Sequence, residues 1–144
     1  MSTWGDRTLT KRLAGEPLVK PFTRNETSGT FKVFQEIAMG GQEYGANTIK
    51  TGGNGEIAQN VADNLGGVGY VGLSYANAPG VKAVPIEGVT PDPANASTYP
   101  LSRKLFYYTI ADKTSPEAMK FIKWSQSSTE AAAIITEVGF IPGK

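Results

Sequence analysis

The apolar residues of this chain recur with a helical spacing in four stretches. They return every three or four positions within residues 28–39, 56–65, 115–124 and 129–138, which places them on one face of a helix. The first and third stretches begin at a serine, a residue type that is favoured as a helix N-cap. The sequence therefore predicts four amphipathic helices.

Runs of apolar and aromatic residues between these stretches predict strands. Residues 18–22, 68–73 and 81–86 form short apolar runs, and residues 103–110 give the strongest strand pattern because they are aromatic and β-branched. Strands and helices therefore alternate, which is typical of an α/β domain with one mixed β-sheet and helices on its faces. No repeat or linker divides the chain, so we expect residues 1–144 to form a single domain.

The composition limits the chemistry that the chain can perform. It is 40% hydrophobic and 19% charged, which is typical of a globular protein. A net charge of +1 argues against a nucleic-acid partner, which would favour a strongly basic surface. The absence of Cys and His excludes thiol nucleophiles, His-based triads and Cys/His metal sites. The sequence therefore predicts no cofactor and no metal.

Hydropathy along the chain predicts no contact with a membrane interior. No apolar run approaches the ~20 residues that a membrane span requires. Residues 1–20 are polar and lack the apolar centre of a signal peptide. We therefore expect a soluble protein, cytoplasmic if the chain is complete, or part of a longer protein whose export signal is missing.

The segment "RNETSGT", residues 24–30, has the composition of an anion site. A helix that begins after Ser28 would offer free backbone N–H groups and a partial positive charge. Gly29 would allow a ligand close to the main chain, and the hydroxyl groups of Ser28 and Thr30 would donate further hydrogen bonds. The guanidinium group of Arg24 matches a phosphate or a carboxylate with two bonds. The sequence therefore predicts a site for a tetrahedral oxyanion.

Glu26 is the acidic residue of the same segment. It would repel an anion unless it is paired with Arg24, which it would then hold in one orientation. It would also accept a proton from a ligand oxygen and so favour hydrogen phosphate over sulfate. The segment has an ordinary structural interpretation as well, in which Ser28 only caps a helix and Arg24 is a surface cation.

The glycines of Gly67-Val-Gly69-Tyr-Val-Gly72 match the pattern G-x-G-x-x-G of dinucleotide-binding proteins. That fingerprint requires a strand before the glycines and a helix after them. Here the predicted helix comes first and the predicted strand follows. We therefore interpret these glycines as a helix end and as positions of close packing.

Several segments resemble a known family in order and spacing. "RNETSGTFKVF" (24–34) resembles the Arg-x-Asp-Gly-Ser-Gly-Thr segment of phosphate-binding proteins, the extracytoplasmic receptors of phosphate ABC transporters. "GNGEIAQNVADNLGGVGYVGLSYA" (53–76), "YPLSRKLFYYT" (99–109) and "FIKWSQSSTEAAAIITEVGFIP" (121–142) are similar to later segments of the family, and "TWGD" (3–6) to an earlier one. The resemblance extends over nearly the whole chain.

The resemblance implies one lobe of a periplasmic-binding-protein-like fold. These receptors are two-lobed, and only the second lobe has a counterpart here. A non-enzymatic, extracytoplasmic receptor for inorganic phosphate or a similar oxyanion is implied, with a missing first lobe or a second copy of the chain as partner. The implied ligand-binding residues are Arg24, Ser28, Gly29 and Thr30.

Two departures from the family pattern leave other functions open. The Asp of the family is Glu26 here, and the Gly that follows it is Thr27. The side chain of Glu26 is longer than that of Asp, which puts its role in orienting the arginine in doubt. An alternative function is a ligand-free scaffold domain that homodimerises through the lobe fold. A phosphoesterase is the third hypothesis, although the chain lacks an evident base, metal cluster or nucleophile pair.

Overall fold

The computed structural model describes residues 18–143, and "TWGD" lies outside this range. Its centre is a three-stranded parallel sheet in the order β2-β1-β3. Strand β1 is Lys20–Arg24, β2 is Ile49–Thr51 and β3 is Gly67–Gly69. Phe22 at the centre of β1 lies opposite Ile49 of β2 and Gly69 of β3. The predicted α/β lobe is confirmed, and the described strands pair in parallel.

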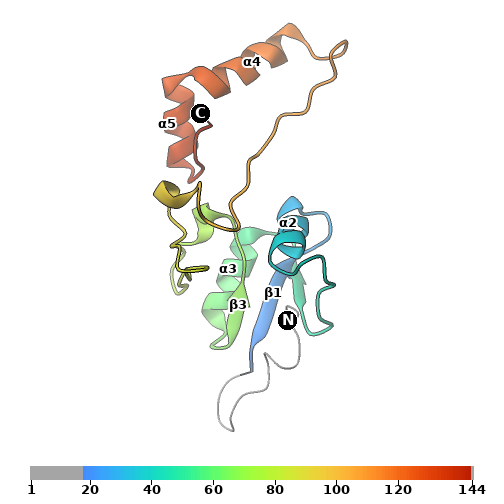
Figure 1. Cartoon of the computed structure of the whole chain (residues 1–144), viewed down its shortest axis with the longest axis vertical. Coiled ribbons are helices and arrows are strands. Elements are labelled where there is room, and N and C mark those ends of the chain that lie inside the picture. Colours follow the sequence, from blue (N-terminus) through green and yellow to red (C-terminus); the bar gives the residue numbers. More distant parts are fainter. Residues whose placement is uncertain (1–17, 144) are drawn as a thin grey trace.

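Two helices connect the strands of this sheet, as parallel pairing requires (Figure 1). Helix α2, Gly29–Ile37, follows β1, and helix α3, Asn54–Asp63, joins β2 to β3. Both confirm the helices predicted from the apolar spacing. Ser28 is the N-cap residue of α2, as the sequence predicted.

The core lies between α3 and the sheet. Ile57 of α3 is 1% exposed and Phe22 is 3% exposed. A Cβ atom added to Gly69 would lie 2.5 Å from Cγ2 of Ile57, so only a glycine allows the strand this close to the helix. This contact confirms the interpretation of the glycine run as close packing, with the helix before the strand.

Helices α4, Pro116–Ser127, and α5, Thr129–Glu137, form a pair at one end of the molecule (Figure 1). Ser115 and Ser128 are their N-cap residues. The turn after α5 contacts the rest of the molecule at Gly139, where an added Cβ would lie 2.6 Å from Cβ of Ser74. Ser74 belongs to the short 3₁₀-helix η1, Leu73–Tyr75. A second 3₁₀-helix, η2, is Pro93–Asn95.

Two of the predicted strands are wrong. Residues 103–110 form an extended connection to α4 rather than a strand (Figure 1), and residues 81–86 contain only one isolated antiparallel bridge, between Ile86 and Val89. The side chain of Phe106 is 68% exposed and that of Tyr108 is 92% exposed. A β-pattern in sequence forms a strand only beside a partner strand, and the described residues offer none here.

Candidate anion-binding site

The candidate site lies at the carboxyl edge of the sheet. Strand β1 ends at Arg24 and β2 ends at Thr51, and the N-termini of α2 and α3 follow within a few residues. Strand β1 is central, with β2 on one side and β3 on the other. Successive connections therefore lead to opposite sides of β1, which makes this edge a topological switch point of the sheet. Ligands of open α/β sheets bind at this kind of edge.

Arg24 connects the end of β1 to the first turn of α3. Its Nη1 lies 3.5 Å from Oδ1 of Asn54, the first residue of α3. Its Nε is buried and has no hydrogen-bond partner among residues 18–143. A buried N–H donor without a partner destabilises the fold by about 1–3 kcal/mol. A ligand that accepted a hydrogen bond from this N–H would remove that cost.

Ser28 performs the structural role that the ordinary interpretation gave it. Its Oγ accepts hydrogen bonds from the backbone N–H of Thr30, at 3.2 Å, and of Phe31, at 3.4 Å. The backbone N–H of Thr30 is therefore already used. The N–H of Gly29 has no partner within the described part of the chain, and the hydroxyl groups of Ser28 and Thr30 keep a proton to donate.

The first turn of α2 contains no acidic residue. By contrast, Glu56, Glu117 and Glu130 lie in the first turns of α3, α4 and α5. A carboxylate in a first turn offsets the partial positive charge of a helix N-terminus. The N-terminus of α2 therefore keeps the positive potential that an anion would meet.

A second arginine lies at this N-terminus and was not predicted as a site residue. A Cβ added to Gly29 would lie 3.5 Å from Nη2 and 3.6 Å from Nη1 of Arg103. Arg103 begins the extended connection, far along the chain from Gly29. Its only sequence signal was its place in the "YPLSRKLFYYT" segment, where it was assigned to a strand.

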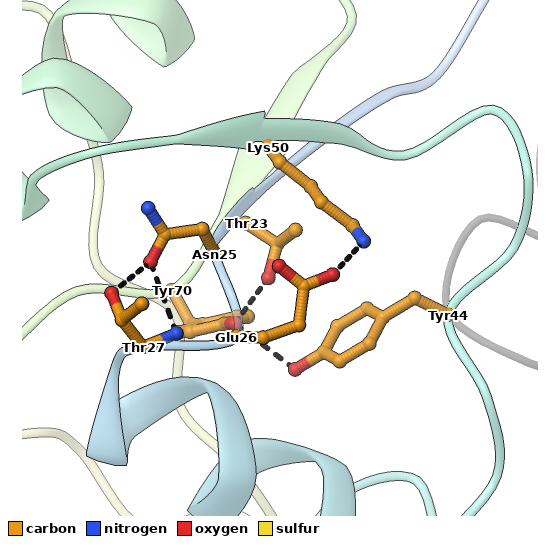
Figure 2. A network of polar contacts seen from close by, with 7 residues as sticks. All are labelled: Thr23, Asn25, Glu26, Thr27, Tyr44, Lys50 and Tyr70. Carbon is orange, nitrogen blue, oxygen red and sulfur yellow. Dashed lines mark hydrogen bonds and ion pairs between the residues drawn. The ribbon is translucent and has the colours of Figure 1, made fainter.

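The ion pair of Glu26 within residues 18–143 is formed with a residue other than Arg24. Glu26 forms an ion pair with Lys50 of β2 (Figure 2), and this hydrogen bond holds the pKa of the Glu26 carboxyl below its usual value. The turn before α2 explains the difference, because Oδ1 of Asn25 accepts from the N–H of Thr27, at 3.3 Å, and from its hydroxyl, at 2.6 Å. This closed turn leaves Glu26 exposed beside β2.

A chain of hydroxyl groups lies behind the site and was also missed by the sequence analysis (Figure 2). Thr23, which is completely buried and precedes Arg24, hydrogen-bonds to the hydroxyl of Tyr70. The hydroxyl of Tyr44 lies 3.0 Å from that of Tyr70 and donates to the carbonyl of Phe31 at 2.9 Å. Burial, followed by the hydrogen bond with Tyr70, raises the pKa of Tyr44 above its usual range. The network ties the end of β1 to α2.

The sequence of the chain places it in a known family. Residues 2–129 match the model of the PBP superfamily domain, so the chain belongs to this family. It is 36% identical to the phosphate-binding protein PstS of Pseudomonas aeruginosa over 99% of its own length and 46% of the relative. It is 31% identical to PstS of Bacillus subtilis over 83% of its length and 40% of the relative. The chain thus spans about half the length of these relatives, and the resemblance inferred from the motifs is confirmed.

Solved structures with the same fold agree with this assignment. One, from Clostridium perfringens, is a substrate-binding protein assigned to phosphate ABC transport and holds bound phosphate. It is 27% identical to this chain with a TM-score of 0.78, over 88% of this chain and 53% of that one. An ABC-type phosphate transport receptor from Vibrio cholerae shares the fold with a TM-score of 0.74 at 23% identity, over 99% of this chain and 58% of the receptor. None of the helices within residues 18–143 is both long and apolar enough to cross a membrane.

Proposed function

We propose that this chain binds inorganic phosphate or a related oxyanion without catalysing a reaction, as the second lobe of a solute receptor of the ABC-transporter type. The observation that carries the proposal is the Arg24 guanidinium group, whose buried Nε has no partner in residues 18–143. It ends the central strand, four residues before the helix cap at Ser28. The names of the relatives, which are phosphate-binding proteins, support the same ligand. An extracytoplasmic location goes with this proposal.

The donors of the site suit a tetrahedral oxyanion. Arg24 supplies charged N–H groups, Gly29 supplies a backbone N–H, and the hydroxyl groups of Ser28 and Thr30 supply two further protons. The positive end of α2 stabilises a negative charge by about 0.3–1 kcal/mol. Most of these donors are held by β1 and α2, so little conformational entropy is lost when an anion binds.

Apart from Glu26, residues 24–30 contain no carboxylate that could accept a ligand proton. Glu26, the acidic residue of the segment, is engaged with Lys50. Without a free carboxylate, this half of the site binds hydrogen phosphate and sulfate with similar affinity, because both anions present two negative charges to the same N–H and O–H groups. We therefore propose that the chain by itself does not discriminate strongly between these two anions.

Isothermal titration calorimetry with phosphate and with sulfate tests the proposal. We expect weak binding, on the order of millimolar Kd or about −4 kcal/mol, because the other faces of the anion stay in water. Arg24→Gln should abolish it, whereas Lys120→Gln, which removes the same charge from α4, should leave it unchanged. Equal affinities of wild type and Arg24→Gln would contradict the assignment of the site.

The exposed connection favours a second candidate function, binding to another polypeptide. Its apolar side chains are 52–92% exposed: Leu105, Phe106, Tyr107, Tyr108 and Ile110. Contiguous exposed apolar surface of this kind is typical of an interface. The partner that we propose is a first lobe equivalent to the rest of the longer relatives, or a second copy of the chain. Light scattering across a concentration series distinguishes self-association from a chain that stays monomeric and requires the other lobe.

A further inference from the structure

We propose that Arg103, at the first turn of α2, is a second guanidinium ligand of the same anion in addition to Arg24. This inference rests on the proposed function, because it assigns one more residue to that site. It also gives the connection between the sheet and α4 a role, since Arg103 is the residue with which this connection begins.

The position of the guanidinium group is the first support. Its Nη2, Nη1 and Cζ lie 3.5, 3.6 and 3.9 Å from the place that a Cβ on Gly29 would take. The absent side chain of Gly29 therefore leaves the guanidinium plane beside the main chain at the start of α2. The turn before it holds this placement, because the N–H of Ser102 donates to the carbonyl of Tyr99 at 2.9 Å.

The electrostatics of this placement is the second support. A cation at the positive end of a helix is repelled, since that end favours anions. The first turn of α2 has no carboxylate to offset the repulsion. Arg103 has no ion pair with any residue between 18 and 143, where Lys50 and Glu26 form such a pair. An oxyanion at Gly29 would attract both the helix end and the guanidinium group, and so would stabilise the arrangement that the structure has.

Two guanidinium groups around one anion predict a dependence on anion charge. Each forms charge-assisted hydrogen bonds, which are roughly twice as strong as neutral ones. A doubly charged tetrahedral anion gains from both, whereas a singly charged planar anion such as nitrate has less charge to share. We expect the chain to prefer phosphate and sulfate to nitrate, and Arg103→Gln to reduce this preference.

Calorimetry on matched variants tests the role of Arg103. We expect Arg103→Gln to weaken phosphate binding about tenfold, the size of one charge-assisted hydrogen bond, and Arg103→Lys to restore part of the loss. Lys104→Gln is the control, because it removes the same charge from the next residue. If phosphate binding is lost in Arg24→Gln but is equal in Arg103→Gln and Lys104→Gln, this inference fails and the proposed function stands. If the wild type binds no phosphate, both fail.

Limited digestion with trypsin gives a readout that a purely structural role would not move. Trypsin must take the guanidinium group of Arg103 into its own acidic pocket to cleave after it. In a Lys104→Gln background, we expect phosphate to slow cleavage after Arg103 and to leave cleavage after Lys113 unchanged. Cleavage after Arg103 at the same rate with and without saturating phosphate would overturn the proposal.

Discussion

The hydroxyl groups of Tyr44 and Tyr70 lie 3.0 Å apart, and Tyr70 also contacts the buried hydroxyl of Thr23. Tyr44 belongs to the loop that follows α2, and Tyr70 directly follows β3. The pair therefore joins segments from both sides of the central strand. Because Thr23 precedes Arg24, this network fixes the backbone from which the proposed ligand-binding guanidinium group extends.

We expect Tyr70→Phe to lower the free energy of unfolding by about 1–3 kcal/mol, because it leaves the buried hydroxyl of Thr23 without its partner. Urea unfolding at constant pH measures the loss. Tyr107→Phe is the matched control, since the Tyr107 side chain is 52% exposed and its change should stay within about 0.5 kcal/mol. Equal stabilities of the two variants would mean that the hydroxyl network contributes nothing measurable.

Two substitutions of Ser28 distinguish its effect on the stability of α2 from its effect on anion binding. Ser28→Ala removes the acceptor for two backbone N–H groups and should cost about 1 kcal/mol of stability. Ser28→Asp keeps a good N-cap and adds a negative charge at the positive helix end, so it should retain stability while it repels phosphate. Unfolding curves and phosphate titrations on the same samples test both effects. Phosphate binding by Ser28→Asp at wild-type affinity would rule out an anion at this helix end.

The ion pair between Glu26 and Lys50 should contribute to stability only while the Glu26 carboxyl is ionised. Lys50 holds the pKa of Glu26 below its ordinary value of 4.5, so the folded state favours the carboxylate. Its contribution is therefore present above the pKa of the unfolded state and is lost as the pH falls through the lower pKa of the folded state. A double-mutant cycle with Glu26→Gln and Lys50→Gln should give a small coupling near neutral pH that declines as the pH falls below 4.5, the ordinary pKa of Glu26. Coupling that persists in acid would contradict the ion pair.

Gly139→Ala tests how the turn after α5 packs against η1. Gly139 has φ +81°, and an added Cβ would overlap Cβ of Ser74 at 2.6 Å. We expect a loss of about 1–3 kcal/mol in unfolding free energy from the strained backbone and the displaced η1. Gly143→Ala is the control, because no atom lies within 4 Å of its added Cβ. If both variants are equally stable, the contact between α5 and η1 does not form in solution.

Local features of the fold could be predicted because they depend on residues close in sequence. The apolar spacing of α2 and α3 and the caps at Ser28 and Ser115 need only a few neighbouring residues. The order in which helix α3 precedes strand β3 was predicted from the same spacing of apolar residues. The family resemblance was also readable, since its motifs are short continuous segments.

The contacts of the site depended on tertiary structure. Glu26 meets Lys50 because β2 pairs with β1 in a register that places Lys50 opposite Thr23. Arg103 reaches Gly29 only because the chain returns to the start of α2 after a long excursion.

The sequence by itself determined the helices, their caps and the segment that carries Arg24 and Ser28, because short-range spacing and capping chemistry specify them. Only the tertiary structure decided that residues 103–110 are an exposed connection and that Arg103 lies beside Gly29. Strand formation and side-chain pairing require a partner that is distant in sequence, and no local pattern specifies where that partner lies.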